Sequence, residues 1–85
     1  MRFLTKGTFK APPTAEVQAL IPAEIAKVKE LTEQGLIAAV YTSADFTTFW
    51  TAWNVDSQAA LEESLKALPL EQFTDFEITA LSEEM

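Results

Sequence analysis

The chain has 85 residues, 48% of them hydrophobic, and a formal net charge of -7 at pH 7. This length suits a single domain, residues 1–85. The negative charge argues against nucleic acid and against an anionic membrane surface as partners, because both attract clustered Lys and Arg. Cysteine and histidine are absent, so the sequence predicts no disulfide, and we expect no metal site and no cofactor.

The hydrophobic core of so short a chain is small and usually needs a supplement, such as a disulfide, a metal or a partner subunit. Association of identical copies is the supplement that this composition leaves, and six Phe, two Trp and one Tyr supply apolar surface for it. No apolar run reaches the ~20 residues that span a bilayer, and the N-terminal segment lacks the apolar stretch of a signal peptide. We therefore expect a cytoplasmic homo-oligomer that does not bind membranes.

Residues 2–10 alternate in character with a period of two, which predicts a β-strand. One face of this strand carries Phe3, Thr5, Gly7 and Phe9, and the other carries Arg2, Leu4, Lys6, Thr8 and Lys10. Pro12 and Pro13 follow directly and would end the strand, because proline cannot donate a ladder hydrogen bond.

A long helix is expected after Thr14, which suits the N-cap position. Apolar residues recur at a spacing of three to four from Val17 to Leu31. Pro22 interrupts this pattern, so either a short first turn precedes a main helix that begins near Pro22, or one helix is kinked there. Gly35 can adopt the left-handed conformation that ends a helix.

Two strands are expected next. Residues 36–43 form an apolar run of strand length, and Ala44 and Asp45 suit a turn. Residues 46–55 are rich in aromatic and β-branched side chains, which favours a second strand directly after that turn.

A second helix and a last strand complete the chain. Asp56 and Ser57 suit a helix start, and Pro69 would end that helix. Residues 73–81 alternate again, and we expect residues 82–85 to be a frayed tail. One face of this last strand carries Phe76, Ile78 and Ala80, and the other carries Phe73, Asp75, Glu77 and Thr79.

The order strand, helix, strand, strand, helix, strand predicts an α+β fold of the ferredoxin-like βαββαβ type. Right-handed crossovers would place both helices on one face of a four-stranded antiparallel sheet. The helix-covered face is assigned to Phe3, Phe9, Trp53, Val55, Phe76 and Ile78. The opposite face is assigned to Leu4, Lys6, Thr8, Thr48, Trp50, Ala52, Asn54, Asp75 and Glu77.

The uncovered face mixes large aromatic residues with charged ones. A solvated face rarely carries Trp50 and Phe46, and a dry core rarely carries Lys6 and Glu77, because burying an unpaired charge is costly. Packing against a second subunit accommodates both groups and would enclose a small cavity of mixed polarity. Two interpretations stay open: Trp50 packs in the dimer or contacts a ligand, and Lys6 and Glu77 form an ion pair or an acid–base site.

Several sets of residues stand in a recognisable order along the chain. They are Phe3, Lys6, Thr8, Lys10 and Pro12, then Val55-Asp56-Ser57, then Leu68-Pro69-Leu70, and finally Asp75, Glu77 and Leu81. Together they resemble the muconolactone isomerase family over nearly the whole chain. The resemblance implies a dimeric α+β barrel, often assembled further into a decamer, and a small organic acid as ligand. It also implies the family reaction, a double-bond shift within a lactone in aromatic catabolism.

Such a shift needs a base that removes a proton made acidic by a carbonyl, and the return of a proton elsewhere. Lys6 and Glu77 match the family pattern, and by chemical inference Lys6 would hold the substrate carboxylate while Glu77 acts as the base. The expected ligand pocket is lined by Leu4, Thr8, Tyr41, Phe46, Thr48, Trp50 and Asp75.

The sequence departs from the family pattern in two places. Leu4 occupies a position where the family has histidine, and the predicted strand 36–43 lacks the family's basic residues. An anionic lactone would be held less strongly, so we expect a more apolar pocket and a substrate other than muconolactone itself. A small-molecule-binding protein without catalytic activity and a purely structural oligomer remain alternatives to an enzyme.

Overall fold

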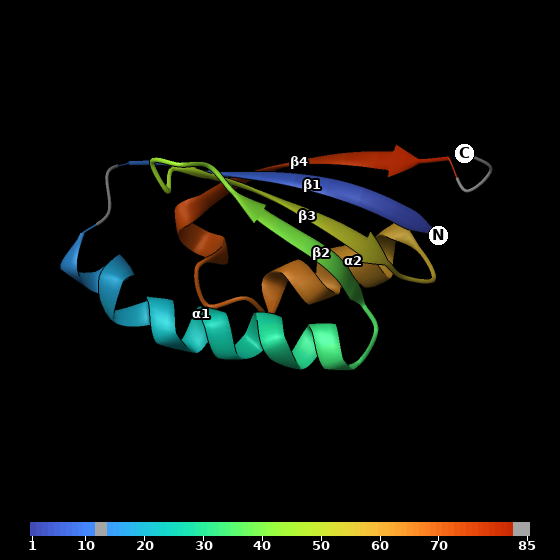
Figure 1. The fold of residues 1–85 in the computed structure, drawn as a ribbon, viewed down its shortest axis with the longest axis horizontal. Coiled ribbons are helices and arrows are strands. Elements are labelled where there is room, and N and C mark those ends of the chain that lie inside the picture. Colours follow the sequence, from blue (N-terminus) through green and yellow to red (C-terminus); the bar gives the residue numbers. More distant parts are fainter. Residues whose placement is uncertain (12–13, 83–85) are drawn as a thin grey trace.

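The expected order of elements is present in the structure, a computed structural model that describes residues 1–11 and 14–82 (Figure 1). The elements are β1 (Arg2–Phe9), α1 (Ala15–Glu33), β2 (Ile37–Thr42), β3 (Thr48–Asn54), α2 (Gln58–Lys66), the short 3-10 helix η1 (Glu71–Phe73) and β4 (Thr74–Leu81). The expectations for Pro12, Pro13 and the tail 83–85 concern residues outside the described part.

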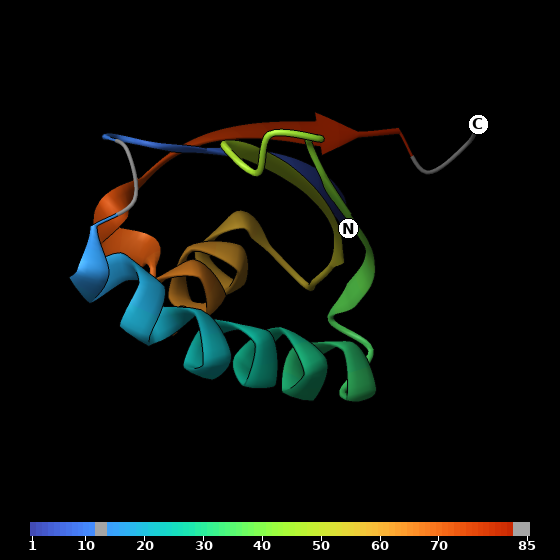
Figure 2. The same cartoon turned by 60° about the vertical axis from the view of Figure 1, so that its left-hand side comes forward.

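The strands form one antiparallel sheet in the order β2-β3-β1-β4, so β1 is central and pairs with β3 on one side and with β4 on the other. Both helices cover the same face of this sheet, and its other face points outward (Figure 2). The predicted ferredoxin-like α+β fold is confirmed. No helix within residues 1–11 and 14–82 is long and apolar enough to cross a membrane.

The two faces assigned from the period-two alternation are also confirmed. Phe3, Trp53 and Val55 are buried beneath the helices, whereas Lys6 and Glu77 are exposed on the outward face. The core between the sheet and the helices is completed by leucines and one isoleucine of the helices, the connections and β2. These are Leu31, Ile37, Leu61, Leu65 and Leu68.

Helix α1 runs through Pro22 as a single helix, so the interpretation with a separate first turn is wrong. Val17 before the proline and Leu31 after it are both buried, and this packing stabilises the helix on both sides of Pro22 although proline donates no hydrogen bond. At the start, the Val17 N–H donates to the Thr14 hydroxyl oxygen at 3.3 Å, as expected for an N-cap. At the end, Gly35 has a φ of 80° and follows the C-cap residue Gln34, so its predicted role is confirmed.

The predicted strand 46–55 begins two residues too early. Phe46 has a φ of 61° and lies in the turn before β3, which starts at Thr48. The reason is local: one carboxylate oxygen of Asp45 accepts hydrogen bonds from the Ser43 hydroxyl at 2.7 Å, the Thr47 N–H at 3.1 Å and the Thr47 hydroxyl at 2.7 Å. Such side-chain bonds replace ladder bonds and hold a turn. Bonds from Ser43 and then Thr47 lower the pKa of Asp45.

Phe73 is likewise not a strand residue. It ends η1, and β4 begins at Thr74, so the expectation that Phe73 shares the outward face with Asp75 and Glu77 is wrong. The Phe73 N–H donates to the Leu70 carbonyl oxygen at 3.0 Å, which closes the 3-10 turn.

A buried hydrogen bond joins the two central strands under the helices. The indole N–H of Trp53 donates to the hydroxyl oxygen of Thr5 at 2.9 Å, and these residues are only 2% and 1% exposed. Water cannot reach either group, so the bond supplies the Trp53 N–H with an acceptor and the Thr5 oxygen with a donor.

Three aromatic rings cross the helix-covered face beside Gly7. The Phe49 ring makes edge contacts with Phe9 and Phe76 at centroid distances of 5.9 and 6.2 Å. A Cβ atom at Gly7 would lie 2.7 Å from the Phe49 ring, so the absence of a side chain lets this ring lie against β1.

Glu24 ties α1 to the connection before η1. One of its carboxylate oxygens accepts a hydrogen bond from the Leu70 N–H at 3.0 Å. Burial raises the pKa of Glu24, and the bond from Leu70 opposes this effect without cancelling it.

Replacing Thr5 by Val tests the buried hydrogen bond. The change keeps the shape but leaves the Trp53 N–H without an acceptor, so the free energy of unfolding should fall by about 1–3 kcal/mol. Urea denaturation followed by circular dichroism measures it. The exposed strand residue Thr42, changed to Val, is the control and should shift this free energy by less than about 0.5 kcal/mol. Equal effects of the two changes would contradict the role given to the Thr5–Trp53 bond.

Replacing Glu24 by Gln tests the partly buried carboxylate. Because the folded-state pKa is raised, the stability from this site is fully present below the ordinary Glu value and is lost as the pH rises through the folded value. Glutamine keeps an oxygen acceptor for Leu70 and does not titrate. The variant should therefore gain stability relative to the native protein between about pH 4 and pH 7. Urea titrations at each pH measure this, with exposed Glu63→Gln as control, and a pH-independent difference would refute it.

Candidate functional site

The outward face of the sheet gathers all but one of the residues that the sequence predicted for the site. These are Leu4, Lys6, Thr8, Tyr41, Thr48, Trp50, Asp75 and Glu77. They come from all four strands and are separated along the chain, so only the pairing of the strands brings them together. Phe46 is the exception, because it lies in the turn between β2 and β3 and is 72% exposed.

One row of this face contains a residue from each strand. Tyr41 pairs with Trp50, Trp50 with Lys6, and Lys6 with Glu77. Directly opposed side chains in such a ladder begin about 4.5–5.5 Å apart. We call these four residues the central row.

The rows on either side of the central row differ in polarity. Thr48, Thr8 and Asp75 form the neighbouring row toward one end of β1. Ala52, Leu4 and Thr79 lie in the row on the other side, where Leu4 is half-buried. The central row therefore lies between a polar row and a row of mixed polarity.

Lys6 and Glu77 form an open ion pair in the single chain. The Lys6 ammonium lies 3.9 Å from a carboxylate oxygen of Glu77, and the two side chains are 47% and 77% exposed. A pair this exposed contributes little to stability. If a second surface excluded water from it, the same pair would interact more strongly with a ligand and with each other. The pair supplies a cation for a developing negative charge and a carboxylate that can accept a proton.

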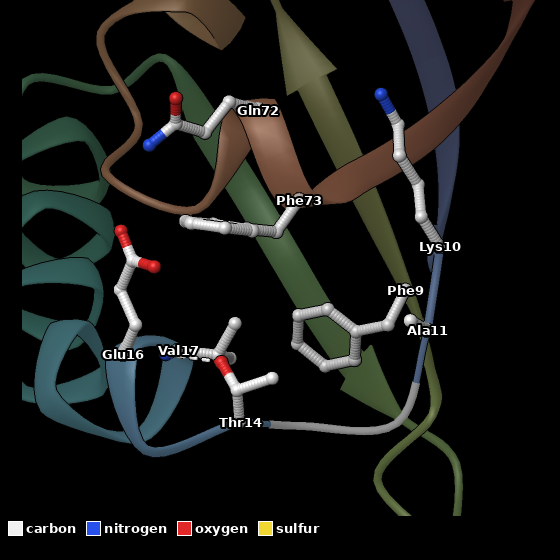
Figure 3. Close-up of a pocket in the computed structure, with 8 residues that line it drawn as sticks. All are labelled: Phe9, Lys10, Ala11, Thr14, Glu16, Val17, Gln72 and Phe73. Atoms are coloured by element: carbon white, nitrogen blue, oxygen red, sulfur yellow. Dashed lines mark hydrogen bonds between the residues drawn. The ribbon is translucent and has the colours of Figure 1, made fainter.

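Two hollows lie away from this face, on the helix-covered side. A cavity of about 180 Å³ lies at the end of the sheet where β1, the start of α1 and η1 meet (Figure 3). Phe9, Val17 and Phe73 are among its lining residues, and we call it the end cavity. A more open hollow lies beside α2 and is lined in part by Leu65, Lys66 and Phe76.

The end cavity was not predicted from the sequence. Phe73 was assigned to the outward face, whereas the η1 turn directs its ring toward α1, where it lines the cavity. The segment that turns Phe73 inward, Glu71–Phe73, directly precedes an alternating strand. With three residues it is too short for periodicity to distinguish it from that strand. Within residues 1–11 and 14–82, no group of three acidic side chains is placed to hold a metal ion.

The family model of muconolactone delta-isomerase matches residues 1–84. The chain belongs to the muconolactone delta-isomerase family. This confirms the resemblance that the order of motifs in the sequence indicated. Comparison with curated protein sequences gave no significant match.

Two solved structures share the fold of this family member. A crystal structure of muconolactone isomerase matches with a TM-score of 0.85 and 26% sequence identity, over 99% of this chain and 91% of that one. The 5-chloro-2-hydroxyhydroquinone dehydrochlorinase of Burkholderia phenoliruptrix AC1100, in complex with 2,5-dihydroxybenzoquinone, matches with a TM-score of 0.74 and 13% identity. That match covers 96% of this chain and 94% of the other. The family and its isomerase structure support an isomerase-like or related catalytic function.

Proposed function

We propose that this protein is an isomerase that moves a proton within a small lactone or carbonyl compound, in a pocket enclosed between the outward faces of two subunits. The observation that carries the proposal is the central row. It places an aromatic pair, a cation and a carboxylate side by side across four strands.

The outward face packs against a second copy of the chain. Tyr41 is 66% exposed, and Trp50 and Leu4 are half-buried on a face that also carries Lys6 and Glu77. Two such faces related by a two-fold axis present the same residues to each other. Their aromatic and apolar parts pack, while the charged pairs are left lining a small enclosed space.

In that space, Glu77 removes a proton from a carbon atom next to the substrate carbonyl. The electron pair of the broken C–H bond moves toward the carbonyl oxygen, where the Lys6 ammonium stabilises the negative charge. The proton returns from Glu77 to a carbon further along the conjugated system, so the double bond shifts and the enzyme regains its initial state. Trp50 and Tyr41 form apolar walls that hold the ring.

The charges next to the central row favour an uncharged substrate. The three rows carry one cation, Lys6, and two carboxylates, Asp75 and Glu77, whereas Arg2 and Lys10 lie toward the two ends of β1. A substrate carboxylate beside Lys6 would face both of these carboxylates. An uncharged lactone or cyclic ketone avoids that repulsion, which agrees with the absence of basic residues from β2.

The second candidate function is binding without turnover. It is favoured by the end cavity, which is hollow and largely apolar in the single chain and lies on the opposite side of the sheet from Lys6 and Glu77.

Glu77→Gln tests the catalytic role. If Glu77 is the base, kcat/KM should fall about 10²–10⁴-fold. Turnover is measured spectrophotometrically with muconolactone and with uncharged lactones and cyclic enones. Exposed Glu63→Gln makes the same chemical change on α2 and should keep full activity. Sedimentation velocity and urea denaturation check that assembly and stability are retained, and an unaltered rate in Glu77→Gln would exclude this mechanism.

Tyr41→Glu tests the association of the outward faces. A carboxylate in the central row would face its own symmetry mate, so the oligomer should dissociate at concentrations where the native protein is assembled. Phe46→Glu is the matched control, since it also changes an exposed aromatic residue but lies in the turn. Light scattering gives the mass of each species. An unchanged mass for Tyr41→Glu, or equal dissociation of both variants, would place the subunit contact elsewhere.

A further inference from the structure

We propose that the end cavity is a second binding site, separate from the central row, and that it takes one uncharged ring of about the size of benzene. The cavity lies between the sheet and the start of α1, on the helix-covered side. The central row lies on the other side of the same sheet, so the two sites do not share a wall.

Three apolar side chains among the lining residues are held in place by the fold. Phe9 is fixed by the edge contact of its ring with Phe49, at a centroid distance of 5.9 Å. Val17, in the first turn of α1, is 5% exposed. The ring of Phe73 forms a third wall, and the three side chains lie around the same space in Figure 3.

Backbone hydrogen bonds position the Phe73 wall. The Lys10 N–H donates to the Phe73 carbonyl oxygen at 3.0 Å, which joins the end of β1 to η1. The Phe73 N–H is itself bonded to Leu70, whose N–H is bonded to Glu24 of α1. All three elements around the cavity are therefore linked, and the space does not depend on a single flexible side chain.

The volume of the cavity selects a single ring. It measures about 180 Å³, and an apolar protein cavity of about 150 Å³ is known to bind benzene. One ring with one small substituent therefore fits the cavity.

The charges around the cavity select an uncharged ring. Figure 3 shows the Lys10 ammonium and the Gln72 amide directed away from the three apolar side chains, and the Glu16 carboxylate at one side of them. A charged group inside would be desolvated without a partner, which is strongly unfavourable. An anion would in addition face Glu16.

Phenol and benzoate test the charge requirement, because both are soluble single rings and only phenol is uncharged near neutral pH. Binding to the native protein is followed by NMR titration. We expect saturable binding of phenol with intermolecular nuclear Overhauser effects to the methyl groups of Val17. Benzoate should bind at least about tenfold more weakly.

Two variants locate the bound ring. Phe73→Ala removes one wall and Val17→Phe fills the space, so each should weaken phenol binding at least about tenfold. Leu81→Ala, which removes an exposed apolar side chain paired with Arg2 at the opposite end of β1 from Phe9, should leave it unchanged. Circular dichroism verifies that each variant is folded. If a variant does not fold, the Overhauser effects to Val17 in the native protein still decide the location.

The proposal fails if phenol gives no saturable shifts, if its Overhauser effects involve residues other than those of the cavity, or if Val17→Phe binds it as well as the native protein does. Glu77→Gln separates this site from the proposed active site. It should bind phenol with native affinity even where it has lost turnover, and a joint loss of both would show that one site serves both roles.

Discussion

The alternation of side chains along β1 is the constraint on which both faces of the molecule depend. Because β1 pairs with β3 and with β4, each of its residues is placed by two ladders at once. The buried bond between Thr5 and Trp53 fixes Thr5 under the helices, and the next residue, Lys6, must then point outward. A shift by one residue would bury the Lys6 ammonium and leave the Trp53 N–H without its acceptor, so a slipped register is strongly disfavoured.

This register also decides what chemistry the outward face can perform. Two solved proteins with this fold carry the names of different reactions, an isomerisation and a dehydrochlorination. The fold therefore does not specify the reaction, which depends on the residues that the strands present. In this chain the ladders align an aromatic pair with Lys6 and Glu77, while β2 contributes no charge of its own.

On the helix-covered side, the side chains of the sheet form the core with the helices, and at one end of the sheet they line the end cavity. Gly7 admits the Phe49 ring against β1, and that ring holds Phe9 at the wall of the end cavity. Glu24 is kept partly buried, at some cost to its charged form, because its bond to Leu70 anchors the turn that carries Phe73. Packing that stabilises the subunit and packing that forms a ligand-sized space are thus the same contacts.

Local patterns in the sequence were sufficient for the order of elements, the caps at Thr14 and Gly35, and the face on which Lys6 and Glu77 lie. Each of these follows from spacing along one segment, because strand and helix periods commit side chains to faces before any tertiary contact forms. Tertiary structure decided the rest. Side-chain hydrogen bonds at Asp45 place Phe46 in a turn instead of the predicted strand. Packing on both sides of Pro22 stabilises α1 as one continuous helix. The end cavity forms where three segments far apart in the sequence come into contact, and the periodicity within one segment cannot predict a contact between segments.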